Sequence, residues 1–116
     1  MDNKDKVLLE KILKEIDFLL EYVAIIDYEF FLQSEEKKRT ISMTLINIGE
    51  KAYHLSKNFR INNQDIPIQN AIGLRNVAAH GYDTLKPRSI WNTVTRDIPE
   101  LRSKILNILL NSQPHE

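Results

Sequence analysis

The sequence predicts an all-α protein, an antiparallel bundle of four to five helices. Three observations support this fold class. Apolar residues recur at intervals of three and four through most of the 116-residue chain, a spacing that places them on one face of a helix. No segment shows the apolar–polar alternation of a half-buried strand. The connections between periodic segments are short, which favours antiparallel packing of successive helices.

The first periodic segment predicts one long amphipathic helix over residues 4–31. Its apolar stripe consists of Leu9, Ile12, Ile16, Leu19, Val23, Ile26 and Phe30. Further apolar residues widen this stripe, so we expect the helix to contact more than one neighbour. The polar stretch 33–36 ends the element.

The second periodic segment predicts a helix that packs antiparallel to the first. Its apolar positions are Ile41, Leu45, Ile48, Ala52, Leu55 and Phe59. Gly49 lies in its middle and costs about 1 kcal/mol relative to alanine in a helix. Such a glycine often permits the close approach of another backbone, whereas simple tolerance is the alternative interpretation.

A polar loop over 60–66 and Pro67, which suits the first turn of a helix, predict a third helix over 67–80. Pro87 opens a last helical stretch that contains Pro99. Two readings of that stretch remain open. Either a new helix begins near Pro99, with Asp97 as its cap, or a single helix is kinked there.

The octet 75–82 carries the chemistry of the chain. Arg75 is a permanent cation, His80 titrates near neutral pH, and Asn76 lies four residues before His80 on the same helical face. Gly81 predicts that the helix ends at His80 and presents the imidazole at its open end. Histidine is also favoured there by the helix dipole alone, so a structural role is the alternative.

Arg75 is expected to pair with Glu50. It shares a helical stripe with apolar residues, and a guanidinium on such a stripe needs an anionic or hydrogen-bonding partner. Glu50 on the second helix is the carboxylate that the sequence offers. His54, on the same helix, is expected on the exposed flank and not in a catalytic site.

Composition narrows the function classes. The 16 basic and 16 acidic residues cancel, which argues against a strongly electrostatic nucleic-acid binder. Residues 1–36 carry 4 basic and 10 acidic side chains, whereas 37–104 carry 12 and 5; this asymmetry leaves room for a local anionic ligand, or reflects ordinary surface patterning.

No metal, cofactor or membrane association is expected. The chain has no cysteine, and its three histidines lie at no metal-ligand spacing. It has no apolar run near 18 residues and no signal-peptide pattern at its start. We therefore expect one cytoplasmic domain over residues 1–116, with its core at about 5–110.

With these features in place, the chain resembles the HepT family of the HEPN superfamily, toxins partnered by minimal nucleotidyltransferase antitoxins of the MntA type. The octet matches the family's Arg-x4-His-x-Tyr signature, with Asn76 where Asp or Asn is usual. The other matching segments are Ile48–Ala52, Ile66-Pro67, Trp91 and Asp97–Leu101.

The resemblance implies a HEPN-like helical bundle that forms a homodimer through helix faces, with two motifs along a shared cleft. It implies a metal-independent endoribonuclease with RNA as substrate, and an MntA-type antitoxin that transfers AMP to Tyr82. A buried, purely structural Tyr82 is the alternative at that position.

The residue chemistry is compatible with that activity. Attack by a ribose 2′-hydroxyl needs a base, an acid and positive charge at the phosphate. His80 can act as base or acid, Arg75 can bind phosphate, and Asn76 can orient His80 or a phosphate oxygen. One His80 cannot be both acid and base in one step, which is an independent reason for a dimer. A non-catalytic nucleotide- or substrate-binding subunit of a nucleotidyltransferase is the alternative function, and a purely structural helical dimer is a third.

Overall fold

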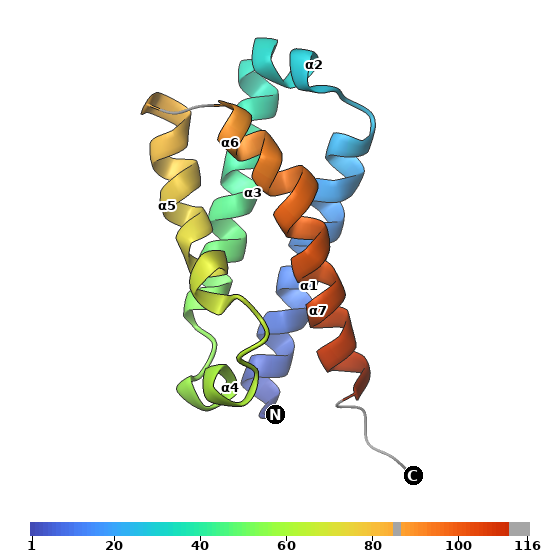
Figure 1. Cartoon of the computed structure of the whole chain (residues 1–116), viewed down its shortest axis with the longest axis vertical. Coiled ribbons are helices and arrows are strands. Elements are labelled where there is room, and N and C mark those ends of the chain that lie inside the picture. Colours follow the sequence, from blue (N-terminus) through green and yellow to red (C-terminus); the bar gives the residue numbers. More distant parts are fainter. Residues whose placement is uncertain (85–86, 112–116) are drawn as a thin grey trace.

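A computed structural model describes the backbone of residues 1–84 and 87–111 and the side chains of residues 1–76 and 87–111. All regular elements in this part are helical, which confirms the all-α fold class (Figure 1). In chain order they are α1 (Asn3–Ala24), α2 (Tyr28–Gln33), α3 (Glu35–Tyr53), α4 (Lys57–Asn62), α5 (Ile68–Thr84), α6 (Pro87–Asn92), the π-helical η1 (Thr93–Asp97) and α7 (Ile98–Asn111).

The long helices α1, α3 and α5 and the continuous stretch α6–η1–α7 form four rods that run in alternating directions, and the short helices α2 and α4 lie at the ends of the bundle (Figure 1). Helix α3 packs against α1 on one side and most extensively against α5 on the other. The fourth rod, made of α6, η1 and α7, contacts α1 and α5. Helix α2 lies at one end and α4 at the opposite end (Figure 1). The predicted antiparallel bundle is therefore confirmed.

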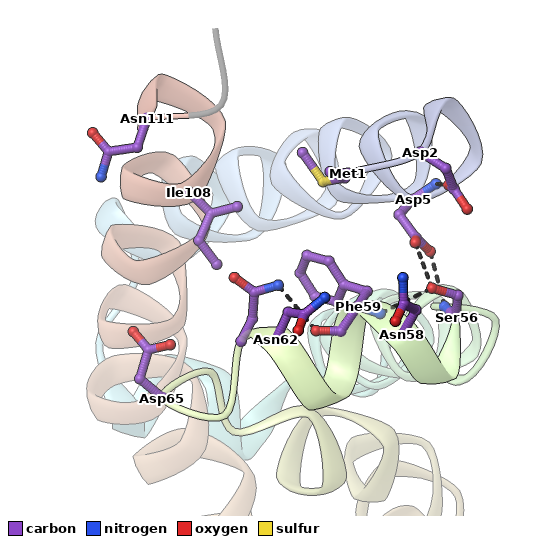
Figure 2. A pocket seen from close by; sticks show the side chains of 11 residues that line it. Met1, Asp2, Asp5, Ser56, Asn58, Phe59, Asn62, Asp65, Ile108 and Asn111 are labelled. Atoms are coloured by element: carbon purple, nitrogen blue, oxygen red, sulfur yellow. Dashed lines mark hydrogen bonds between the residues drawn. The ribbon is translucent and has the colours of Figure 1, made fainter.

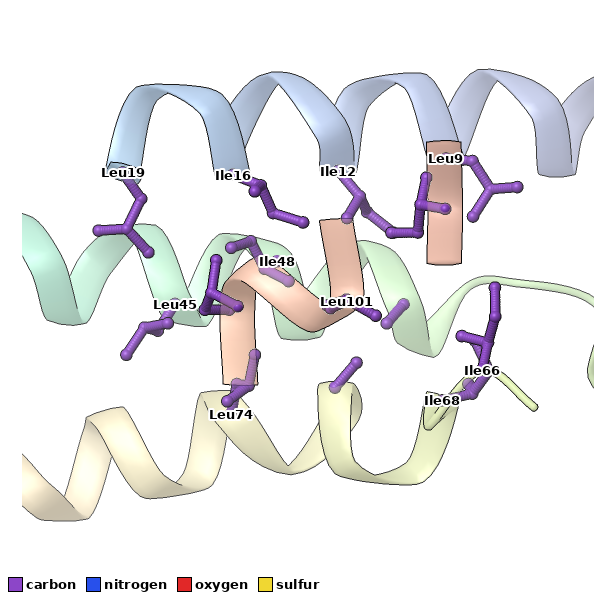
Figure 3. Close-up of a cluster of buried hydrophobic side chains, with 14 of the residues drawn as sticks. Leu9, Ile12, Ile16, Leu19, Leu45, Ile48, Ile66, Ile68, Leu74 and Leu101 are labelled. Atoms are coloured by element: carbon purple, nitrogen blue, oxygen red, sulfur yellow. The ribbon is translucent and has the colours of Figure 1, made fainter. Parts of the chain in front are cut away.

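The core lies where the apolar stripes of the rods meet (Figure 3). Helix α1 contributes Leu9, Ile16 and Leu19, each fully buried, and α3 contributes Leu45 and Ile48. Burial of apolar surface of this kind is the main stabilising term of a small bundle. Within the described residues, no helix combines the length and the apolar character needed to cross a membrane.

The prediction of one helix over residues 4–31 was wrong, because the chain breaks after Ala24. Asp27 caps a new helix: its side chain accepts a hydrogen bond of 2.8 Å from the Phe30 N–H. The break turns α2 across the end of the bundle, where Phe31 is fully buried. Phe31 packs there against Trp91 of α6, with ring centroids 5.2 Å apart. Periodicity alone missed this cap.

A second break separates α3 from α4. The prediction of a loop over residues 60–66 was wrong in part, because residues 60–62 belong to α4. Ser56 caps α4 by accepting from the Phe59 N–H at 3.0 Å. The Ser56 N–H and hydroxyl donate to the two carboxylate oxygens of Asp5, at 2.8 and 2.6 Å (Figure 2). Asp5 is only 2% exposed. This paired contact ties the first turn of α1 to the start of α4.

The last rod decides between the two readings of Pro99. The helix continues from α6 into α7, and both Asn92 and Ile98 have right-handed helical backbone angles. No side chain caps a new helix there; the turn widens into η1 instead. Proline lacks an N–H and would crowd the carbonyl four residues back in a regular helix. The wider turn accommodates it, so one distorted helix is correct.

Candidate functional site

Arg75 lies on α5 where that helix packs closely against Gly49 of α3. A Cβ atom added to Gly49 of α3 would meet the Arg75 backbone N at 2.9 Å and the Ile72 carbonyl O at 3.1 Å. Only a residue without a side chain allows two backbones to approach so closely. The predicted role of Gly49 in close backbone approach is confirmed, and the neighbouring helix is α5.

The predicted partner of Arg75 is present in the structure. Nη1 of Arg75 donates to Oε1 of Glu50 at 2.8 Å. The Arg75 side chain is 28% exposed and that of Glu50 52% exposed. An ion pair this accessible contributes about 0–1 kcal/mol to stability. Its main effect is therefore to orient the guanidinium.

Tyr53 also holds Arg75, and sequence reasoning missed it. The guanidinium carbon lies over the Tyr53 ring, 4.6 Å from its centroid. Glu50 and Tyr53 are three residues apart on α3, so they share a face of the helix. This three-residue spacing is the feature of the sequence that could have predicted that Tyr53 also contacts Arg75. His54 is exposed, as expected, and its ring meets that of Tyr53 edge to face at 5.4 Å.

Arg75 retains donors for a ligand. A guanidinium has five N–H donors, and among the described residues only Glu50 accepts one of them. Asn76 follows on α5 and is exposed. Arg75 and Asn76 therefore stand at the surface together, with a fork able to bind a phosphate in a bidentate way.

The end of α5 differs from the prediction. The helix runs through Gly81 to Thr84 and does not stop at His80. Glycine lowers helix propensity but keeps its N–H, so it permits a helix to continue. The side chains of His80 and Tyr82 lie outside the described residues.

A pocket of about 450 Å³ lies between α1, α4 and α7 and includes no residue of the octet among its described lining (Figure 2). Three carboxylates line it, from Asp2, Asp5 and Asp65, together with several asparagines. Within the described part of the chain, no basic side chain lines this pocket. Such a lining repels phosphate, which leaves Arg75 as the better anion site. No cluster of three or more potential metal ligands occurs among the described residues.

Comparison with known proteins identifies the family. The family model described as ribonuclease HepT-like matches residues 12–108. This chain belongs to the HepT-like ribonuclease family. The matched region includes α3, α5 and the whole octet, so the segments that carry the candidate site lie within it.

Individual relatives agree with the HepT-like assignment. A protein of Caldanaerobacter subterraneus subsp. tengcongensis named "Putative RNase" is 36% identical over 101 residues, which cover 87% of this chain and 90% of the relative. A protein of Thermococcus cleftensis named "Probable ribonuclease HepT" is 29% identical over 104 residues, covering 90% and 94%. No solved structure matches the chain.

Proposed function

We propose that this HepT-like protein is a metal-independent endoribonuclease and the toxin of a toxin–antitoxin pair. The observation that carries the proposal is the partly exposed Arg75 guanidinium, oriented by Glu50 at 2.8 Å and placed at the start of the Arg-x4-His-x-Tyr motif. A single-stranded RNA offers the phosphates that such a fork binds. The family membership of the chain supports RNA as the substrate.

The proposed step is an internal transfer at phosphorus. The 2′-oxygen of a ribose forms a bond to the adjacent phosphorus as one His80 takes its proton. The bond from phosphorus to the 5′-oxygen breaks, and that oxygen receives a proton from a second His80. Arg75 stabilises the charge that gathers on the phosphoryl oxygens. Asn76 orients His80 or a phosphate oxygen.

This division of labour requires two copies of the chain. A single His80 cannot take up and deliver a proton in the same step, whereas a symmetric homodimer supplies one imidazole for each task. We therefore propose that two octets line one cleft between partner subunits.

The proposal predicts cleavage of RNA in the presence of EDTA. Because the 2′-oxygen is the nucleophile, the products are expected to end in a 2′,3′-cyclic phosphate and a 5′-hydroxyl. End-group analysis of a labelled single-stranded RNA by mass spectrometry checks this. Products with a 3′-hydroxyl and a 5′-phosphate would contradict it. Nucleotide binding without any cleavage by the wild-type protein would instead support a non-catalytic subunit of a nucleotidyltransferase.

Neutralisation is proposed to occur at Tyr82. An MntA-type nucleotidyltransferase transfers AMP from ATP: the Tyr82 phenolic oxygen bonds to the α-phosphorus, and pyrophosphate and the phenolic proton leave. The added phosphate lies two residues from His80 and competes with RNA for Arg75. We expect Tyr82→Phe to escape neutralisation, with no mass increase after incubation with the antitoxin and ATP. Loss of RNA cleavage by Tyr82→Phe under those conditions, as in the wild type, would contradict this role.

A further inference from the structure

Tyr53 contacts Arg75 but has no part in the proposed reaction. We propose that its ring is the stacking platform for a nucleobase of the RNA, next to the phosphate bound by Arg75. This inference rests on the proposed function and adds to it a contact that binds the substrate strand.

The contacts of Tyr53 leave about half of the residue exposed. The Arg75 guanidinium lies over the ring at 4.6 Å, and the His54 ring approaches at 5.4 Å and an angle of 78°. Tyr53 is nevertheless 51% exposed. A ring that carries a cation over it and is still half exposed has room for a base to stack.

The platform is held in place before a ligand arrives. Tyr53 is the last residue of α3, and Arg60 of α4 donates to its carbonyl oxygen at 2.7 Å. A tyrosine side chain has only two main rotatable bonds, so ordering it on binding costs little entropy. Arg75 restrains the ring further by stacking. A base that stacks there therefore meets a surface that is already formed.

The charge around Tyr53 suits a nucleic-acid strand. From residue 51 to residue 64 the chain carries Lys51, Lys57 and Arg60 and no carboxylate. Single-stranded RNA is bound by aromatic rings that stack with splayed bases, combined with cations that contact phosphates. The segment after Glu50 carries both kinds of group close to Tyr53 in the sequence.

The chain contains a matched pair for comparison. Phe30 of α2 is 55% exposed and carries the Lys37 ammonium over its ring at 4.7 Å. Helix α2 lies at the opposite end of the bundle from α4 (Figure 1). Acidic residues surround Phe30 in the sequence, at positions 27, 29, 35 and 36. A cation over an exposed ring therefore occurs at both ends, but carboxylates cluster around Phe30 in the sequence, whereas Glu50 is the one carboxylate within ten residues of Tyr53.

The experiment measures binding separately from cleavage. Fluorescent 2′-O-methyl RNA hexamers cannot be cut by a 2′-hydroxyl, and a series in which each nucleotide in turn is abasic locates the stacked base. Fluorescence anisotropy gives the dissociation constant for wild type, Tyr53→Leu, Tyr53→Phe and Phe30→Leu. Circular dichroism confirms that each variant folds.

One abasic position is expected to weaken binding to wild type by roughly 5- to 150-fold, the range for one stacked base. Tyr53→Leu is expected to bind the intact strand more weakly than wild type by a similar factor. Its affinity for the strand with that abasic position should be no lower than its affinity for the intact strand. Tyr53→Phe and Phe30→Leu bind as wild type does. This non-additive pattern is the signature of a direct contact.

Two results would overturn the platform. If the losses from Tyr53→Leu and from the abasic site multiply, Tyr53 only positions Arg75. If Tyr53→Leu binds as tightly as wild type, or if wild type does not bind the hexamers, no base stacks on the ring. The nuclease proposal is tested by a different measurement, the rate of RNA cleavage by the Arg75 and His80 variants, so its failure can be distinguished from failure of the stacking proposal.

Discussion

Arg75→Ala is expected to lower kcat/KM for RNA cleavage by about 10²–10³-fold, since removal of one preorganised donor to developing charge has that effect. His80→Ala is expected to lower it by about 10²–10⁴-fold through loss of proton transfer. Arg75→Lys keeps the charge but not the planar fork, so its rate falls between those of wild type and Arg75→Ala. Initial rates on a fluorogenic RNA measure all three.

Arg88→Ala is the matched control for the loss of an arginine. The Arg88 guanidinium also lies over a tyrosine ring, that of Tyr28, at 3.8 Å. It belongs to α6 and lies outside the octet 75–82 that carries the proposed reaction. Arg88→Ala should therefore cleave RNA at the wild-type rate. Wild-type rates for both Arg75→Ala and His80→Ala would rule out the nuclease site proposed above.

Two alanine substitutions of helical glycines are expected to have opposite effects. Each gains about 1 kcal/mol of helix propensity. A Cβ at Gly49 meets backbone atoms of α5 at 2.9–3.1 Å, whereas a Cβ at Gly73 meets nothing within 4 Å. Overpacking of this kind costs about 1–3 kcal/mol. Gly73→Ala should be more stable than Gly49→Ala by that amount, measured as the free energy of unfolding in urea.

Gly49→Ala should also lower the rate of RNA cleavage, because the atoms that the new Cβ would crowd include the backbone N and the Cβ of Arg75. A shift of about 1 Å in a group that binds the transition state costs roughly 10²-fold in rate, and contacts of 2.9–3.1 Å are relieved by a smaller shift. Gly49→Ala is therefore expected to lose less than roughly 10²-fold in kcat/KM, whereas Gly73→Ala retains full activity. Equal stability and equal activity of the two variants would contradict the close helix contact.

The sequence predicted the bundle because period and polarity are local properties. The apolar stripes predicted the long helices. Glu50 was predicted as the partner of Arg75 because a guanidinium on an apolar stripe needs an anionic partner. The ends of helices were less predictable. Asp27 and Ser56 cap new helices inside segments whose apolar spacing continues across the break. The cap is a competing local interaction that a hydrophobic pattern does not reveal.

Other features depend on atoms that come together only in the folded chain. Tyr53 stacks on Arg75 across two helices, and neither residue type predicts the other. For the segment around Pro99, the sequence allowed two interpretations, a new helix or one distorted helix. It could not decide between them, because the choice depends on how α6 and α7 pack against α1 and α5. The roles of His80 and Tyr82 remain predictions from the motif and the family resemblance.

The bond between Asp5 and Ser56 gives the start of the chain an influence on the proposed substrate surface. Ser56 lies three residues after Tyr53, whose ring we assign to base stacking. It caps the short helix α4, whose Arg60 donates to the Tyr53 carbonyl oxygen. Trimming the first turn of α1, or fusing a bulky tag directly to it, would therefore loosen RNA binding at a distance. A carboxy-terminal tag is the safer choice for measuring affinity.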